Sequence, residues 1–468
     1  MAGLTTNGRA AAALLELAGA RLATFIDGLE EAPAVGPPLS EAERIALAAA
    51  PGENPTPASD VMDRCMRAAE SALESAGPAG FAYIPGSGLV GSAIGELITR
   101  VTNRYVPLSE FAPGLVALED GVLRWMASLF GMPEGANGVL TTGGSHAVLG
   151  MLVAARERML GRDADLARAR LYVSDQAHHC VDKAARVAGF PRAAVRVIPA
   201  SDGRHLEPDA LDAAIRDDRA DGMTPFLVVA TAGTTNSGAV DPLHPLADVA
   251  RAHGLWYHVD ACYGGFFVLT ERGSDRLAGI ERADSISLDP HKSLFMPFGT
   301  GALVMRDPGL LAAAHDDIEA SDYLQDVEAS ALPDYARLGF ELSREARGLR
   351  LWLPLHLHGV GAFRDTLDEK LDLAEHAHER LSSIPGLDVL ERPELSIVTF
   401  RVRAGDDASR ALVREINATR SVFCSSTILD GRVTLRACIL AVRTRRRHVD
   451  RLVDAVRNAV AEVSARPV

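Results

Sequence analysis

One lysine stands directly after an apolar run, in a setting that could make it reactive. Lys292 closes the string DPHK, which follows the apolar run 285–288. A lysine at such a position is partly buried, and burial disfavours the ammonium and lowers its pKa. An amine with a lowered pKa is suited to forming a Schiff base with a carbonyl group. Lys292 is therefore the first candidate for a chemical role.

Four other polar segments also follow apolar runs, and their strings are TTGGSH (141–146), SDQAHHC (174–180), TAGTTN (231–236) and HVDACYGG (258–265). The first is a Gly/Ser turn that opens a helical stretch. Free N–H groups and the helix dipole make such a start an anion site, although the same turn can be purely structural. In the last segment Asp260 ends an apolar run, where a carboxylate can pair with a cation or cap a helix.

Short apolar runs alternate with helical stretches from about residue 138 onward. The expected strands are 138–140, 171–173, 195–198, 226–230, 256–259, 285–288 and 302–304. This alternation predicts an α/β fold with a mostly parallel seven-stranded sheet covered by helices on both faces. Ligands of such sheets bind outside the carboxyl ends of the strands, so the five polar segments are expected to converge there.

The pattern of elements divides the chain into three parts. Residues 1–90 are expected to form a helical N-terminal segment whose apolar faces suit dimerisation. Residues 91–360 are expected to form the large α/β domain. Residues 361–468 mix helical and strand patterns and predict a small C-terminal α+β domain.

Composition excludes several classes of function. The net charge of −14 argues against a nucleic-acid binder and against a polybasic membrane adaptor. We find no targeting or membrane-spanning segment. The five cysteines form no CxxC pair and no zinc-binding pattern, so we expect no metal and a reducing, cytoplasmic location.

Taken together in order and spacing, the strings SDQAHH, TAGTTNSGAVDP, HVDACYGG and DPHK resemble the group II pyridoxal-phosphate-dependent amino-acid decarboxylases. The resemblance runs from about Phe81 into the small domain. It implies the aspartate-aminotransferase-like fold (fold type I) and pyridoxal 5'-phosphate as the cofactor. It also implies a homodimer with the active site at the interface, which converts a small-molecule substrate, an L-amino acid, to an amine and CO2.

The resemblance also implies roles for individual residues. Lys292 would form the Schiff base with the cofactor, Asp260 would pair with the pyridine nitrogen, and His178 would stack on the ring and contact the substrate carboxylate. Further cofactor contacts are implied for Gly144, Ser145, Thr235 and His291.

Family members deliver a proton to Cα from a tyrosine on a loop. Tyr335 matches this tyrosine by its spacing to the string SREAR, and Tyr323 is the alternative. The resemblance implies a substrate pocket containing Phe81, Tyr83, Ile84 and, from the partner subunit, Tyr105, which favours an aromatic or bulky apolar substrate. Two other reactions on this fold stay open, namely an aldehyde synthase that consumes oxygen and an aminotransferase.

Overall fold

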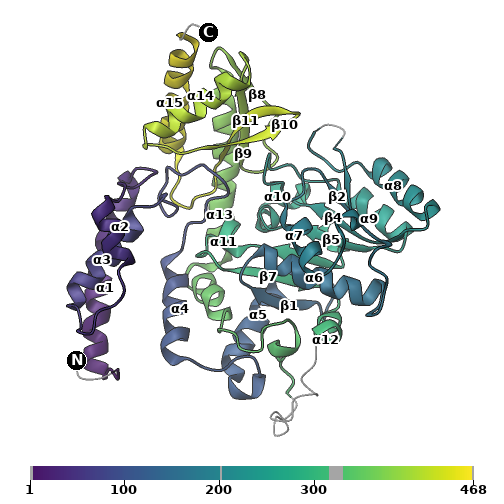
Figure 1. Cartoon of the computed structure of the whole chain (residues 1–468), viewed down its shortest axis with the longest axis horizontal. Coiled ribbons are helices and arrows are strands. Elements are labelled where there is room, and N and C mark those ends of the chain that lie inside the picture. Colours follow the sequence, from purple (N-terminus) through teal and green to yellow (C-terminus); the bar gives the residue numbers. More distant parts are fainter. Residues whose placement is uncertain (1–3, 201–202, 316–329, 466–468) are drawn as a thin grey trace.

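The computed structural model describes residues 4–200, 203–315 and 330–465 (Figure 1). Its main feature is a seven-stranded sheet in the large domain. In spatial order the strands are β1 (Asn137–Thr141), β7 (Gly301–Met305), β6 (Ser285–Leu288), β5 (Trp256–Asp260), β4 (Thr224–Thr231), β2 (Ala169–Ser174) and β3 (Val195–Ile198). Within the described residues, β7 runs antiparallel to both of its neighbours, and the other six strands share one direction. The predicted mostly parallel sheet is confirmed, and each expected run lies within one of these strands.

Helices cover both faces of this sheet, and as a consequence every residue of β5, β6 and β7 is buried. The helices of this domain are α5 (Pro113–Leu129), α6 (Gly144–Met159), α7 (Cys180–Val187), α8 (Pro208–Ala220), α9 (Leu243–Ala252), α10 (Glu271–Arg276), α11 (Pro290–Ser293) and α12 (Gly309–His315). Helix α6 begins three positions after the last residue of β1, and α11 begins two positions after the last residue of β6, so two helix starts face the carboxyl ends of the strands.

The C-terminal part contains a smaller, fully antiparallel sheet. Its strands in spatial order are β10 (Ser425–Leu429), β11 (Arg432–Cys438), β9 (Ile397–Val402) and β8 (Leu387–Val389), and α14 (Asp406–Ala418) and α15 (Arg446–Ala465) pack against it. The predicted small α+β unit is confirmed as an architecture. Strand β10 was not anticipated from the sequence.

A long helix, α13 (Gly348–Ser382), connects the two sheets (Figure 1). Its helical geometry is interrupted at Gly359, where φ is 71° and ψ is 154°. A positive φ of this kind favours glycine. The interruption lies next to the predicted domain limit at residue 360, although the three domain boundaries themselves remain predictions.

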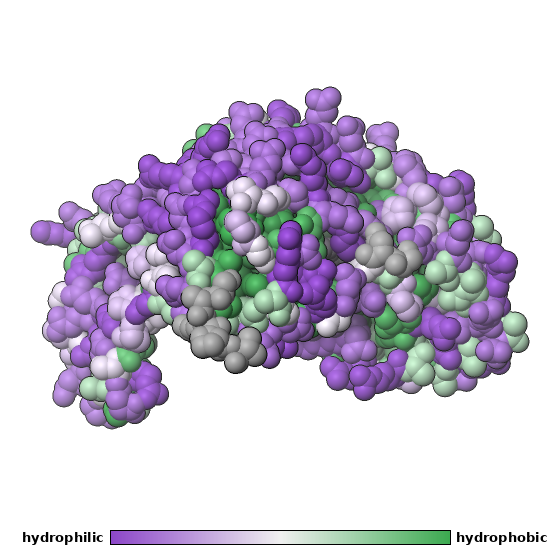
Figure 2. All heavy atoms as spheres, turned by 90° about the horizontal axis from the view of Figure 1, so that it is seen from above, coloured by the Kyte–Doolittle hydropathy of each residue, from purple (hydrophilic) through white to green (hydrophobic). Residues whose placement is uncertain are grey.

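The N-terminal helices α1 (Gly8–Gly28), α2 (Glu41–Ala48) and α3 (Ala58–Glu70) form a lobe that projects from the rest of the chain (Figure 1). Seen from above, the lobe extends at the left of Figure 2, where hydrophilic residues cover most of the visible face. Helix α4 (Val90–Thr102) lies between this lobe and α13. Among the described residues, no helix combines the length and the apolar character needed to cross a bilayer.

Candidate active site

The five polar segments meet at one edge of the large sheet. They line a cavity of about 260 Å³ at the carboxyl ends of β1, β2, β4, β5 and β6. All seven residues predicted to bind the cofactor line this cavity. They are Gly144, Ser145, His178, Thr235, Asp260, His291 and Lys292. The structure therefore brings together every cofactor-binding residue that the sequence predicted.

The Lys292 amine is held by a carboxylate that the sequence analysis gave no role. Lys292 Nζ lies 2.9 Å from Oδ2 of Asp289, and both side chains are largely buried. Burial by itself lowers the pKa of Lys292, but the negative charge of Asp289, with a smaller effect from Asp260, raises it above its ordinary value. The expectation of a lowered lysine pKa is therefore wrong for this arrangement, because an ion pair outweighs desolvation.

His178 faces the cavity as a neutral imidazole. Burial lowers its pKa, and the nearby carboxylate of Asp260 only partly offsets this effect. Its Nδ1 accepts a hydrogen bond from the backbone N–H of Cys180 at 3.3 Å. The ring proton is therefore on Nε2, which leaves this N–H as a donor.

The start of α6 offers backbone donors to an anion. The Gly144 N–H already donates to Oδ1 of Asp289 at 2.6 Å, so a negative group is bound at this helix start. A side chain at Gly144 would not fit, since a Cβ would lie 2.3 Å from Sγ of Cys262. This close approach explains the glycine, and it leaves the backbone accessible to a phosphate.

His291 is fixed in orientation beside this helix start. Its Nδ1–H donates to the backbone carbonyl of Thr300 at 2.7 Å, and Nδ1 lies 3.6 Å from Asp289 Oδ1. Burial lowers the pKa of His291. A neutral ring at this place can contact a phosphate without adding a full charge.

Tyr335 does not reach the cavity that contains Lys292. It lies in a short 3-10 helix, η8 (Tyr335–Arg337), with 1% of its surface exposed. The Arg344 guanidinium packs 4.5 Å from the centre of its ring, and its hydroxyl has no hydrogen-bond partner among the described residues. The structure therefore does not bring Tyr335 into the cavity of its own chain, and its role as the general acid remains a prediction. The alternative, Tyr323, lies outside the described residues.

The predicted substrate-pocket residues also lie outside this cavity. Phe81 is fully buried in the core of the small domain, and Ile84 is buried in the core of the large one, so their contact with a substrate remains a prediction. Tyr83 and Tyr105 are 63% and 45% exposed, respectively. They do not line the cavity of their own chain, and their contact with a substrate remains a prediction.

Two residues of the site were not assigned a role from the sequence. Asp289 and Cys262 stand within the strings DPHK and HVDACYGG, one at the helix start and the other against Gly144. The only indication in the sequence that they belong to the site is their position within those two strings. Among the described residues, no group of three or more His, Cys, Asp or Glu side chains is arranged to hold a metal ion.

Comparison with known proteins agrees with this geometry. Residues 41–403 match the family described as "Pyridoxal-dependent decarboxylase conserved domain". The chain is 33% identical to an aromatic-L-amino-acid decarboxylase of Bacillus atrophaeus, covering 82% of this chain and 81% of the relative. It is 30% identical to a phenylacetaldehyde synthase of Arabidopsis thaliana, with coverages of 80% and 79%.

A solved structure extends the similarity to nearly the whole fold. The TDC of Oryza sativa, solved with PLP and tryptamine, superposes with a TM-score of 0.92 at 28% identity, covering 98% of this chain and 99% of that chain. The residues around the cavity fit the cofactor named there. A lysine amine, a buried carboxylate, a neutral imidazole and a helix start with an adjacent glycine match its aldehyde, ring nitrogen, ring face and phosphate.

Proposed function

We propose that this chain, which belongs to the family of pyridoxal-dependent decarboxylases, converts an aromatic or other bulky apolar L-amino acid to the amine and CO2. The observation that carries the proposal is the meeting of Lys292, Asp260 and His178 in one cavity beside the start of α6. The aromatic preference is supported by the bacterial relative, named for aromatic L-amino acids, and by the tryptamine in the rice structure.

Each of these residues has a distinct task in the proposal. Pyridoxal 5'-phosphate, when bound, supplies an electron sink. Lys292 would attach it through the amine, and Asp260 would keep its pyridine nitrogen protonated. His178 would lie against the ring and donate from Nε2 to the substrate carboxylate.

Phosphate binding would use the other end of the cavity. We assign it to the backbone at Gly144 and Ser145, with His291 beside it, and we place Thr235 near the ring. The hydrogen bond from the Gly144 N–H to Asp289 would have to break when the phosphate binds, because two anions that share one donor repel each other.

Protonation of Cα needs a donor within hydrogen-bond reach. Because Tyr335 is packed in the core, we propose Tyr323 for this role, on the basis of the family resemblance alone. Amine yield and oxygen uptake in the variants Tyr335→Phe and Tyr323→Phe test this assignment.

We also propose that the chain is a homodimer with residues of both subunits at the site. Helix α4 supports this. It packs closely on α13 through Gly91 and Gly95. Its opposite face carries five apolar side chains that are 43–72% exposed, namely Val90, Ile94, Leu97, Ile98 and Val101. A contiguous apolar stripe of this kind is typical of a surface that is covered in the assembly.

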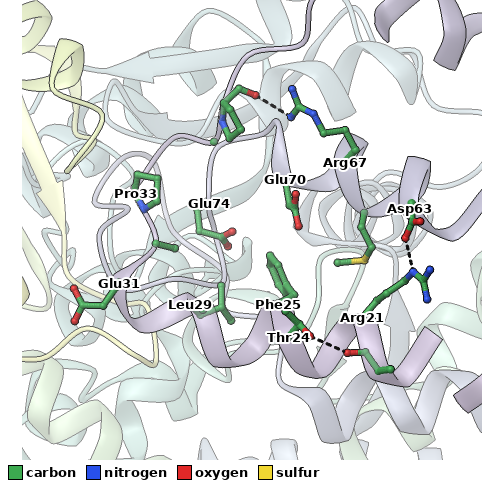
Figure 3. Close-up of a pocket in the computed structure, with 16 residues that line it drawn as sticks. Arg21, Thr24, Phe25, Leu29, Glu31, Pro33, Asp63, Arg67, Glu70 and Glu74 are labelled. Atoms are coloured by element: carbon green, nitrogen blue, oxygen red, sulfur yellow. Dashed lines mark hydrogen bonds and ion pairs between the residues drawn. The ribbon is translucent and has the colours of Figure 1, made fainter. Parts of the chain in front are cut away.

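The N-terminal lobe offers a second surface for the same interface. A groove of about 800 Å³ runs between α1 and α3, with Phe25, Leu29 and Met66 in its lining (Figure 3). The ion pair of Arg21 with Asp63, at 2.6 Å, closes one side. We assign the groove and the α4 stripe to one obligate interface, which is expected to bury more than ~2,000 Å².

The experiment that tests the function is a panel of the twenty amino acids with the PLP-loaded enzyme, measuring CO2 and amine together. We expect equimolar CO2 and amine with aromatic substrates. Lys292→Ala should abolish covalent trapping of the cofactor by borohydride, and Lys183→Ala is the matched control. Trapping that survives in Lys292→Ala would refute the lysine assignment.

A second candidate is the aldehyde-forming reaction, which the similarity to phenylacetaldehyde synthase favours. Oxygen uptake and ammonia release in proportion to substrate would identify it. Turnover that depends on an α-keto acid would instead indicate an aminotransferase. We further propose a cytoplasmic enzyme, supported by the five free cysteines.

A further inference from the structure

A chain of buried polar side chains lies behind Asp260, on the side away from solvent. Strands β5 and β6 run parallel there, with His258 opposite Ser285 and Asp260 opposite Ser287. Because side chains alternate along a strand, Trp256, His258 and Asp260 lie on one face of β5. All five side chains are at most 6% exposed. Polar groups buried to this degree must satisfy one another.

The hydrogen bonds form one continuous path. Trp256 Nε1 lies 2.9 Å from Ser285 Oγ, and Ser285 Oγ lies 2.8 Å from His258 Nδ1. On the other side of the ring, His258 Nε2 lies 3.1 Å from Ser287 Oγ. Ser287 Oγ in turn lies 3.3 Å from Asp260 Oδ1.

The donation from Ser287 to Asp260 fixes the direction of the other hydrogen bonds along this path. Ser287 donates its hydroxyl proton to Oδ1 of Asp260, so its oxygen is the acceptor toward Nε2 of His258. Nδ1 then accepts from Ser285, which itself accepts from the indole N–H of Trp256. The imidazole is then neutral with its proton on Nε2, and it donates to Ser287. Burial lowers the pKa of His258 to about 4, which agrees with a neutral ring.

Ser287, having accepted from His258, has its hydroxyl proton available for Asp260. Oδ1 of Asp260 therefore receives Ser287 and also the backbone N–H of Cys262, at 3.1 Å. The other oxygen, Oδ2, makes no hydrogen bond to a described residue. Two donors on one oxygen leave the second as the acceptor for a cation in the cavity.

We infer that His258 is a positioning residue that, through Ser287, holds the Asp260 carboxylate with Oδ2 directed at the pyridine nitrogen of the cofactor. The inference rests on the role proposed for Asp260. It adds that a histidine without cofactor contact, through the carboxylate that it positions, determines how firmly the ring nitrogen stays protonated.

The test loads the enzyme with pyridoxal phosphate labelled with ¹⁵N in the ring and records the ring-nitrogen chemical shift. His258→Leu and Ser287→Ala should move the shift toward the unprotonated value. They should also lower kcat on the order of tenfold while KM changes little, as expected when a group that orients a ligand is lost. His258→Gln, which can still donate to Ser287, should restore most of both values. Trp256→Phe should act in the same direction but less strongly.

The control for a buried serine is Ser409→Ala, in the small domain, where Ser409 accepts from the Val402 N–H. It should leave the nitrogen shift unchanged. A wild-type shift in Ser287→Ala would overturn the inference, whether or not His258→Leu folds. The variant Asp260→Asn distinguishes failure of this inference from failure of the role proposed for Asp260. If it moves the shift and Ser287→Ala does not, only this inference fails, and if neither does, the role of Asp260 fails as well.

Discussion

Asp289 stabilises the charged form of Lys292, the residue that we propose attaches the cofactor. Its carboxylate lies 2.9 Å from Lys292 Nζ and raises the pKa of that amine, against the effect of burial. Only the neutral amine can attack the cofactor aldehyde. The same carboxylate occupies the Gly144 N–H at the helix start, where the phosphate is expected to bind. Both effects oppose capture of the cofactor.

We therefore predict that Asp289→Asn captures cofactor more readily. The lysine pKa should fall, and the pH at which capture reaches half its maximal rate should drop by about one unit or more. The measurement is the absorbance change after pyridoxal phosphate is added to cofactor-free enzyme at a series of pH values. Asp289→Glu, which keeps the charge, is the control. An unchanged profile in Asp289→Asn would mean that the ion pair does not govern the amine.

Tyr335→Phe tests whether this buried tyrosine takes part in the reaction. The buried hydroxyl has no described partner, so its removal should raise the free energy of unfolding, by about 1 kcal/mol. Amine formation should stay near the wild-type rate, whereas Tyr323→Phe should continue to release CO2 while amine gives way to aldehyde and oxygen uptake. Amine yield and oxygen consumption, measured on both variants, decide between the tyrosines. Loss of amine in Tyr335→Phe would restore it as the acid.

For individual residues, the sequence predicted which side chains reach the cavity when they directly follow a strand, but not when they lie between elements. Lys292, Asp260 and His178 were placed correctly because parallel strands bring their carboxyl ends together. Phe81 and Tyr335 lie outside the cavity of their own chain, and spacing along a chain does not reveal which side of the backbone faces the core. The ion pair of Lys292 was missed because it depends on the geometry of a single turn.

Among the elements, the regular strands were predictable and one irregular hairpin was not. Residues 195–198 and 285–288 were predicted with the limits that β3 and β6 have. Strand β10 was missed although Asp430 and Gly431, with φ of 52° and 69°, form the two-residue turn that joins it to β11. An Asp-Gly pair between two short apolar runs is the usual signal of such a hairpin. Exposed residues in β10 weakened its apolar alternation.

Helix α4 leads to a prediction about assembly. A charge within its exposed apolar stripe should oppose burial against a second subunit. Val101, which is 72% exposed, is the most accessible position. We predict that Val101→Glu weakens the dimer by at least about tenfold in Kd without unfolding the chain. Sedimentation velocity over a concentration series measures this, and Val187→Glu, at another exposed valine, is the control. A dissociation constant equal to that of the wild type in Val101→Glu would contradict the placement of α4 in the interface.

For the whole molecule, buried histidine makes stability depend on pH. The pKa of His258 is about 4 in the folded chain against an ordinary value of 6.5. Between these values the unfolded chain binds a proton that the folded chain excludes, so the free energy of unfolding rises with pH, by about 3 kcal/mol in total. Asp241 acts oppositely, since burial raises its pKa to about 6.

The contribution of His258 can be isolated by difference. Urea unfolding of wild type and His258→Gln between pH 4.5 and 7.5 should give curves that diverge as pH rises, because glutamine does not titrate. The contribution of Asp241 is common to both proteins and cancels. Parallel curves would mean that His258 is not held neutral by burial.

The last prediction concerns whether one chain is enough to build the active site. Tyr105 is 45% exposed, packs edge-on against Phe111 with ring centres 6.2 Å apart, and does not line the cavity of its own chain. If it serves the partner's cavity, Lys292→Ala and Tyr105→Ala should each be inactive alone but complement each other. Co-expressed with two different tags, they form a mixed dimer in which one site has both residues intact. The mixture should therefore recover about a quarter of the wild-type activity. If Tyr105 instead acts within its own subunit, every site of the mixed dimer lacks one of the two residues, and no activity returns.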